Sequence, residues 1–211
     1  MTEKEWYPRK LRVGADGTAG TYEFLQSAYT PDTPFTYAEF GIYQAATARH
    51  VCELFPAATL YLFDFQKNID QARKTLSGFP NEIKYFANSE RFNDSYNWSL
   101  GKLVEQHPTD PIFDYCFLDG AHTFAVDALN YYLCDRLLKV GGYMDFDDYH
   151  WKLRGSSLDP LKVPEILLQY TEEQIDARQV KMIVDVLVRP DPRYQECVKN
   201  KVFRKIGGAG A

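Results

Sequence analysis

The sequence lacks clustered cysteines, long apolar runs and any concentration of basic residues. Its cysteines lie far apart, at Cys52, Cys116, Cys134 and Cys197, so we expect reduced thiols rather than a zinc site or a disulfide framework. No apolar run approaches membrane-spanning length, and the first residues do not form a signal peptide. The basic residues are dispersed, and the net charge is −5. We therefore expect a cytoplasmic protein that binds neither a membrane nor nucleic acid.

The chain is long enough for one α/β domain, because it has 211 residues of which 45% are hydrophobic. We expect an N-terminal segment or lid over residues 1–34, a main domain over residues 35–206, and a disordered tail over residues 207–211. Aromatic residues are dense before Gly41, and a short helix is predicted over residues 21–29. These aromatic residues could form a substrate wall, or they could pack that helix against the sheet.

Apolar strand-length runs alternate with helical segments through most of the chain. The expected strands cover residues 35–41, 59–63, 82–87 and 111–118, and a fifth follows Gly142; the expected helices cover residues 45–55, 68–76, 96–106 and 123–138. After residue 148 we expect a loop, a short helix over residues 164–170, and two further strands, Val180–Val188 and Glu196–Ile206. This order predicts a Rossmann-like, doubly wound, seven-stranded α/β sheet, mostly parallel, with a C-terminal antiparallel hairpin.

Acidic residues follow two neighbouring strands of the predicted sheet. Asp119 ends the fourth strand and His122 comes three residues later, while Asp147 and Asp148 end the fifth. Because the carboxyl ends of parallel strands meet at one edge, we expect these groups to converge, and holding them together is costly without a cation or a shared proton. The alternative is that the acids are loop residues or helix caps and that His122 caps the following helix.

Polar residues also follow the first three strands. Gly41 lies in the turn after the first strand, where a glycine lets the backbone approach a ligand, but the pattern Gly-x-Gly-x-x-Gly is missing, which argues against NAD or FAD. Asp64 ends the second strand, where it could bind the hydroxyls of a ribose or cap a helix. Asn88 and Ser89 end the third strand and could contact an adenine or simply form a turn.

The motifs resemble those of class I S-adenosylmethionine-dependent methyltransferases, and more narrowly the metal-dependent O-methyltransferases of the catechol and macrolide-sugar (TylF-like) type. The resemblance covers roughly residues 35 to 190. The specific pieces are Phe117-Leu118-Asp119-Gly120-Ala121-His122 and the run from Gly141-Gly142 to Asp147-Asp148, with Glu39-x-Gly41, Asp64 and Asn88-Ser89 in support. The chain departs from the family where Ala45 replaces the usual second glycine.

This resemblance implies a role for each matching residue. It implies that S-adenosylmethionine is bound by Glu39, Gly41 and Tyr43 of the first turn, by Asp64, Asn88 and Ser89 at the next two strand ends, and by Asp119. It also implies that Asp119, Asp147 and Asp148 hold Mg²⁺ or another divalent cation, and that His122 is the general base. The implied acceptor is a hydroxyl of a small molecule, aromatic or sugar.

Two other functions remain open from the sequence. Asp145-Phe146-Asp147 forms an Asp-x-Asp motif, which metal-dependent nucleotide-sugar transferases use to hold a diphosphate. A binding protein with the same fold and no catalysis is also possible, because fold alone does not decide function. The final strand could pair across a homodimer or be a plain sheet edge.

Overall fold

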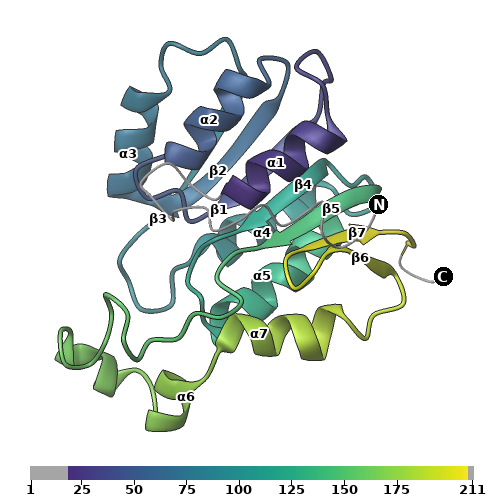
Figure 1. Ribbon diagram of the computed structural model, residues 1–211. Coiled ribbons are helices and arrows are strands. Elements are labelled where there is room, and N and C mark those ends of the chain that lie inside the picture. Colours follow the sequence, from purple (N-terminus) through teal and green to yellow (C-terminus); the bar gives the residue numbers. More distant parts are fainter. Residues whose placement is uncertain (1–18, 209–211) are drawn as a thin grey trace.

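A seven-stranded sheet forms the centre of the computed structural model, which describes residues 19–208 (Figure 1). The strand order is β3-β2-β1-β4-β5-β7-β6, in which β1 to β5 are parallel, β7 is antiparallel to β5, and β6 is antiparallel to β7. The strands are β1 (Thr36–Phe40), β2 (Thr59–Phe65), β3 (Ile83–Asn88), β4 (Phe113–Leu118), β5 (Leu138–Phe146), β6 (Tyr194–Val198) and β7 (Val202–Lys205). This confirms the predicted doubly wound sheet with its C-terminal antiparallel hairpin.

Helices cover both faces of this sheet. They are α1 (Ala19–Ala28), α2 (Ala46–Leu54), α3 (Gln66–Thr75), α4 (Tyr96–Gln106), α5 (Phe124–Leu137), α6 (Glu172–Asp176) and α7 (Gln179–Ile183), with a 3-10 turn η1 (Pro164–Leu168) and a π-helical turn η2 (Val184–Val188). Strand residues alternate between the two faces: on β4, Tyr115 and Phe117 pack with the residues of α1, α2 and α3, whereas Cys116 and Leu118 pack with those of α4, α5 and α7. Both faces are therefore buried, as in other parallel sheets.

The segment predicted as the strand Val180–Val188 is helical, so this prediction was wrong. The β-branched residues of the run favour a strand by propensity. The buried residues, however, are Val180, Ile183, Val184 and Val188, which follow the helical spacing of three and four and belong to the core cluster in which α7 packs against α5. Tertiary packing therefore overrides propensity here, and both strands of the closing hairpin come from residues 194–205.

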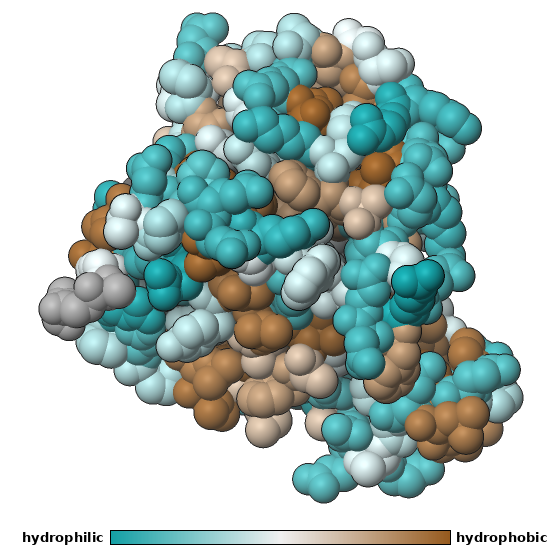
Figure 2. All heavy atoms as spheres, turned by 180° about the vertical axis from the view of Figure 1, so that it is seen from behind, coloured by the Kyte–Doolittle hydropathy of each residue, from teal (hydrophilic) through white to brown (hydrophobic). Residues whose placement is uncertain are grey.

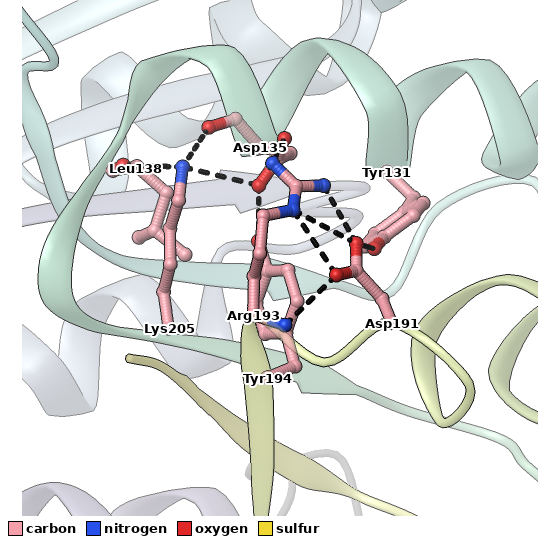
Figure 3. Close-up of polar contacts among 7 residues, drawn as sticks. All are labelled: Tyr131, Asp135, Leu138, Asp191, Arg193, Tyr194 and Lys205. Atoms are coloured by element: carbon pink, nitrogen blue, oxygen red, sulfur yellow. Dashed lines mark hydrogen bonds and ion pairs between the residues drawn. The ribbon is translucent and has the colours of Figure 1, made fainter. Parts of the chain in front are cut away.

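The hairpin is fastened to α5 by a network of polar side chains (Figure 3). Asp135 of α5 accepts hydrogen bonds from the Arg193 guanidinium and the Tyr194 hydroxyl, each at 2.8 Å, and its carboxylate lies 3.0 Å from the Lys205 ammonium. Arg193 also pairs with Asp191 in the preceding turn. A buried carboxylate that faces two cations is compensated, and the network fixes where β6 and β7 join the sheet.

The aromatic residues before Gly41 include Phe24 of α1 and Tyr29, which pack against the sheet. Phe24 is buried with its ring 4.9 Å from that of Tyr143, and the Tyr29 ring stacks on Phe35 at 3.9 Å. For these residues the structure shows the packing alternative. The predictions for residues 1–18 and for 209–211 fall outside the described residues.

Residues 149–178 form a separate lobe beyond the carboxyl edge of the sheet, around α6 (Figure 1). The lobe has a small core of its own, made of Leu153, Ile166 and Ile175.

Among the helices of residues 19–208, none combines the length and apolarity that crossing a bilayer requires. The view from behind shows apolar side chains gathered in the lower centre of that face (Figure 2), and two exposed apolar residues of α5 are Leu129 and Tyr132. The homodimer remains a prediction.

Candidate active site

The carboxyl ends of β1, β4 and β5 meet at one edge of the sheet and bring the predicted acids together. The hydrogen-bonding ladder continues one residue past each strand, because Asp119 donates its N–H to the Phe40 carbonyl and Asp147 donates its N–H to the Leu118 carbonyl, both at 3.0 Å. The register therefore places Asp119 and Asp147 on adjacent strand ends.

His122 lies between two of the predicted acids. Its Nε2 atom is 3.8 Å from Asp119 Oδ1 and 3.5 Å from Asp148 Oδ2. The three side chains are partly buried, and their nearest ligand atoms all lie within 4.8 Å of one another. The ring centroid of Trp151, a residue of the lobe, lies 5.1 Å from that of the His122 imidazole. The structure thus brings together Asp119, His122 and Asp148, under an aromatic cover.

Asp147 is held by a residue that the sequence did not point to. The ammonium of Lys201, in the turn between β6 and β7, lies 3.5 Å from Asp147 Oδ1 and 2.9 Å from Asp145 Oδ1. Lys201 is buried, and the neighbouring carboxylates raise the pKa of its ammonium in spite of burial, which acts the other way. The buried ammonium of Lys201 therefore places a positive charge beside the carboxylates of Asp145 and Asp147.

Burial and mutual repulsion raise the pKa of two carboxyl groups of the cluster. The pKa of Asp119 is well above its usual value, mainly because burial removes water, and then because Asp147, Glu39 and Asp148 are negative neighbours. The pKa of Asp148 is raised by burial and by Asp147, while the charges of His122 and Lys201 oppose the shift. A proton or a cation shared at this point relieves both effects.

The loop that carries His122 is clamped from two helices. Tyr96 of α4 donates its hydroxyl hydrogen to Asp127 of α5, and that hydroxyl oxygen accepts the Ala121 N–H at 3.2 Å. Asp127 also accepts the Thr123 N–H at 3.0 Å. His122 itself has a left-handed backbone with φ of 55°, a conformation that L-residues rarely adopt without such support. Tyr96 and Asp127 were missed by the sequence prediction.

The glycine turn is shaped by contacts within the protein. Gly41 has φ of +88°, and a Cβ atom at this position would lie 2.2 Å from the Asp119 carbonyl oxygen. Asp64 closes the turn, since its carboxylate accepts the N–H groups of Ile42 and Tyr43 at 2.8 Å each. Tyr43 is exposed and also has a left-handed backbone. Packing against β4 is thus sufficient reason for a glycine at position 41.

Glu39 lies below this turn and is almost completely buried. It is 1% exposed, and its Oε2 atom accepts the Tyr37 hydroxyl at 3.1 Å. Burial raises the pKa of this carboxyl to about 8, the Asp64 charge adds to the shift, and the hydrogen bond from Tyr37 opposes it. Glu39 can therefore change its charge near neutral pH.

The ends of β2 and β3 lie side by side, with Phe65 opposite Asn88 in the register. Asn88 is buried, and its side-chain oxygen has no hydrogen-bond partner among the described residues. Ser89 donates its backbone N–H and its hydroxyl to Asp94, at 2.7 and 2.6 Å, so it forms a turn. The Phe65 ring is 40% exposed beside this orphan acceptor. Phe65 was not among the predicted site residues. The signal for it in the sequence was an aromatic residue directly after Asp64.

The Asp-x-Asp motif, Asp145-Phe146-Asp147, is not arranged to hold a diphosphate at the protein surface. Asp145 is completely buried, and its carboxylate accepts the hydroxyls of Thr21 and Tyr115, at 2.7 and 2.6 Å, besides pairing with Lys201. A carboxylate enclosed in this way cannot reach a ligand at the surface. The contacts of Asp145 therefore argue against the nucleotide-sugar transferase.

A hollow of about 520 Å³ lies elsewhere, on α2 and α3. It is lined by Gln44, Ala46, Arg49, Gln71 and Thr75, and it contains none of the predicted site residues. The mixed lining offers one charged group, Arg49, and no acid. Its chemistry therefore does not compete with that of the acidic edge.

A divalent cation fits the donor set at the acidic edge. Two carboxylates and one imidazole converge there, and ligand atoms about 2.0–2.2 Å from one ion lie roughly 3–4 Å from each other. The separations of 3.5 and 3.8 Å around His122 are close to this range. The group that converges differs from the predicted set, since it includes His122 and leaves Asp147 beside Lys201.

Comparison with known proteins rests on structure alone. No protein-family profile matches the sequence, and no curated protein matches it either. Among solved structures, an O-methyltransferase from Bacillus cereus in complex with SAH is similar with a TM-score of 0.57 and 13% identity, over 92% of this chain and 84% of that one. A Staphylococcus aureus protein named as a caffeoyl-CoA O-methyltransferase has a TM-score of 0.58 and 13% identity, over 88% and 80% of the two chains.

A third match is a Klebsiella pneumoniae protein named as an O-methyltransferase, with a TM-score of 0.58 and 14% identity, over 92% of this chain and 83% of that one. All three align along most of both chains, and the strand order in this sheet agrees with the fold expected from the motifs. The chain therefore has the class I methyltransferase fold.

Proposed function

We propose that this protein is an S-adenosylmethionine-dependent methyltransferase that transfers the methyl group to a hydroxyl of a small molecule. The observation that carries the proposal is the cluster of Asp119, His122 and Asp148 at the ends of β4 and β5, where β4 is the neighbour of β1 and its glycine turn. A site for a proton or cation beside a cofactor turn is what deprotonation of an acceptor next to a methyl donor requires. The SAH in the Bacillus cereus neighbour supports the choice of cofactor.

The residues of the first three strand ends suit the parts of this cofactor. Glu39 is buried just before the turn, and its carboxyl, whose pKa is about 8, would ionise when the positive charge of the methionine portion lies beside it. Asp64 already accepts several N–H groups of the turn and adjoining residues, so it would reach a ribose from a fixed position. The Phe65 ring and the orphan Asn88 oxygen offer an apolar face and an acceptor to an adenine.

The chemistry at the acidic edge is the transfer of one methyl group and one proton. When bound, the cofactor supplies a methyl group on a positively charged sulfur, and a divalent cation supplies charge that lowers the pKa of a hydroxyl. The transfer would balance with the acceptor oxygen taking the methyl group, the sulfur keeping the electron pair of the broken bond, and the hydroxyl proton passing to His122 or, with His122 bound to a cation, to solvent. The Asp119–His122–Asp148 cluster orients the oxygen, and Trp151 covers the cluster on the lobe side.

His122 can serve this reaction in one of two ways. As the predicted general base, its Nε2 atom accepts the hydroxyl proton. As a ligand of a cation, the same atom uses its lone pair and accepts no proton. Both roles need the imidazole held between Asp119 and Asp148, so loss of the side chain should abolish transfer in either case.

The test is a binding measurement followed by a screen. Calorimetry with S-adenosylhomocysteine should show saturable binding to the wild-type protein, and His122→Ala should retain it, because His122 is assigned to the acceptor side. A screen with labelled S-adenosylmethionine against catechols, hydroxylated aromatics and sugars should then give methylated product with wild type only. The matched control is His150→Ala, which removes an exposed histidine near the site and should keep activity.

Three results would contradict the proposal. Absence of S-adenosylhomocysteine binding would remove the cofactor from the site and leave a different function for the fold. Binding without any methylation by wild type, over the whole screen, would favour the non-catalytic binding protein. Full activity of His122→Ala would refute the role of the cluster.

A further inference from the structure

We infer that this protein pairs with a second copy of itself through the outer faces of α4, α5 and α7, with α5 of one copy against α5 of the other about a two-fold axis. The inference goes beyond the proposed function and does not depend on it. It also differs from pairing through the outer edge of the sheet at β6, because it uses a helical layer and no strand.

The first observation is that α5 is largely apolar on its solvent side as well as on its core side. Leu129 and Tyr132 are exposed, Tyr132 by 65%, and they lie one turn apart on the same side of the helix. Asp127, Asn130 and Asp135 of the same helix are buried. A helix at the surface of a monomer has the opposite distribution, because its apolar side covers the core and its polar side meets water. The outer side of α5 therefore has the composition of a surface that another molecule covers.

The helices on either side of α5 extend this apolar surface. α5 contacts both α4 and α7, and the three helices cover the same face of the sheet. Trp98 of α4 is 69% exposed, and Met182 of α7 and Val186 of η2 are exposed one turn apart. We call these three residues, with Leu129 and Tyr132, the helical apolar face. The view from behind shows apolar side chains gathered in its lower centre (Figure 2).

The helices on the other side of the same sheet provide an internal comparison. Among the side chains described in α1, α2 and α3, every exposed one is polar or charged, including Arg49, Lys67 and Gln71. That layer is the ordinary solvent surface of a doubly wound sheet. The helical apolar face is therefore particular to one layer and does not reflect an apolar surface all over the molecule.

The size of the helical apolar face matches what a homodimer needs. Five exposed apolar side chains on neighbouring helices about 10 Å apart present an area on the order of 500 Å². This is at the upper end of what a monomer exposes in one patch, about 300–600 Å². A stable interface buries about 800 Å² on each partner, of which about 65% is apolar in homodimers. The face thus supplies the apolar part of such an interface, and its surroundings supply the rest.

The distribution of charge makes this face compatible with a copy of itself. A two-fold axis places the same patch on both partners, so an excess of one sign would repel. Lys102 and Glu105 of α4 are exposed and bring both signs to one border, and Arg136 ends the exposed row of α5. Lys181 and Asp185, which adjoin Met182 and Val186 in the chain, are paired with each other. An uncharged centre with a border of both signs favours a second copy over a strongly acidic or basic partner.

The experiment measures the mass of the full chain in solution by gel filtration with light scattering and by sedimentation over a range of concentrations. The chain has a mass of 24.4 kDa, and we expect wild type at twice this mass, with a Kd of about 1 μM or lower. Leu129→Glu and Tyr132→Glu each bring two like charges together near the axis and should weaken the dimer by about a hundredfold or more. Gln71→Glu adds the same charge to α3 on the other layer and should leave the mass unchanged.

Thermal melting gives a second readout and shows that each variant is folded. A dimer that unfolds to separate chains has a Tm that rises with protein concentration. This dependence should be present in wild type and in Gln71→Glu, and absent from Leu129→Glu and Tyr132→Glu, whose replaced side chains face solvent in the single chain.

Two results would overturn the inference. A wild-type protein that stays monomeric at about 100 μM, a hundred times the expected Kd, would show that a second copy does not cover this face. A dimer that persists in both Leu129→Glu and Tyr132→Glu would place the contact elsewhere, such as the edge of the sheet at β6.

Discussion

Replacing Glu39 with Gln should change how the stability of the fold depends on pH. Glu39 is 1% exposed, and burial raises the pKa of its carboxyl from 4.5 to about 8. Gln has nearly the same shape, and its carbonyl oxygen can still accept the Tyr37 hydroxyl, but it does not titrate. The comparison of Glu39→Gln with wild type therefore isolates one ionisation.

The sign follows from the order of the two pKa values. Below pH 4.5 the carboxyl is protonated in the folded and unfolded chains, so it adds no pH dependence. Between pH 4.5 and about 8 the unfolded chain loses its proton while the folded chain keeps it, so stability falls as pH rises. Above about pH 8 both states are ionised, and the folded state carries the full penalty of a buried charge.

The magnitude is set by the distance between the pKa values. A shift of roughly 3.5 units at 1.36 kcal/mol per unit corresponds to at most about 5 kcal/mol, and entry of water into the folded site reduces this to about 2–5 kcal/mol. The free energy of unfolding of Glu39→Gln, relative to wild type, should rise by about 2–3.5 kcal/mol between pH 5 and pH 8, because a small part of the difference is already present at pH 5 and the folded carboxyl is half ionised at pH 8. Other titrating groups cancel in the difference.

The assay is urea unfolding followed by tryptophan fluorescence at pH 5, 6, 7 and 8. Glu105→Gln is a suitable control, since it removes an exposed carboxyl from α4 and should give a flat difference. Parallel stability curves for wild type and Glu39→Gln would show that Glu39 is ionised in the folded protein throughout, and would refute the argument from burial.

Three further substitutions test the packing around the site. Gly41→Ala forces a Cβ atom against the Asp119 carbonyl at a backbone with φ of +88°, and it should lower stability by about 3 kcal/mol or more, or Tm by roughly 6–12 °C; an unchanged Tm would mean that the turn can move. Lys201→Met leaves Asp145 buried without its cation and should lose about 3–5 kcal/mol in urea unfolding, of which Asp145→Asn in the same chain should restore a part. Asp135→Asn removes the carboxylate that joins the hairpin to α5, so the free energy of unfolding should fall by about 3 kcal/mol and the amides of β6 and β7 should exchange earlier with solvent. A fall below about 1 kcal/mol would show that these ion pairs contribute no more than pairs on the surface.

Much of the fold was predictable because its signals are local. The five parallel strands are short apolar runs followed by polar residues, and each of the first four has a helix after it. The segment 180–188 misled because its β-branched residues favour a strand. Lys181, Asp185 and Arg189 stand four residues apart and form ion pairs, which is the spacing of one helix face and the signal that was overlooked.

The sequence predicted that the acidic residues lie close together, but not which partner each of them has. Strand ends in one parallel sheet must share an edge, so Asp119, Asp147 and His122 could be expected together. Which acid faces which partner depends on a lysine that arrives from the hairpin, far along the chain from Asp147. Sequence separation hides such a contact, because it is fixed by the register of β5 and β7 rather than by any local pattern.

The position of Asp145 has a consequence for how the protein is made. Its carboxylate gathers Thr21 from the first described helix, Tyr115 from β4 and Lys201 from the last turn. The acidic edge thus obtains its counter-charge only after residue 201 has been synthesised. Shorter nascent or truncated chains would hold the acids of β4 and β5 without their cation, so assembly of the site should be among the final events of folding.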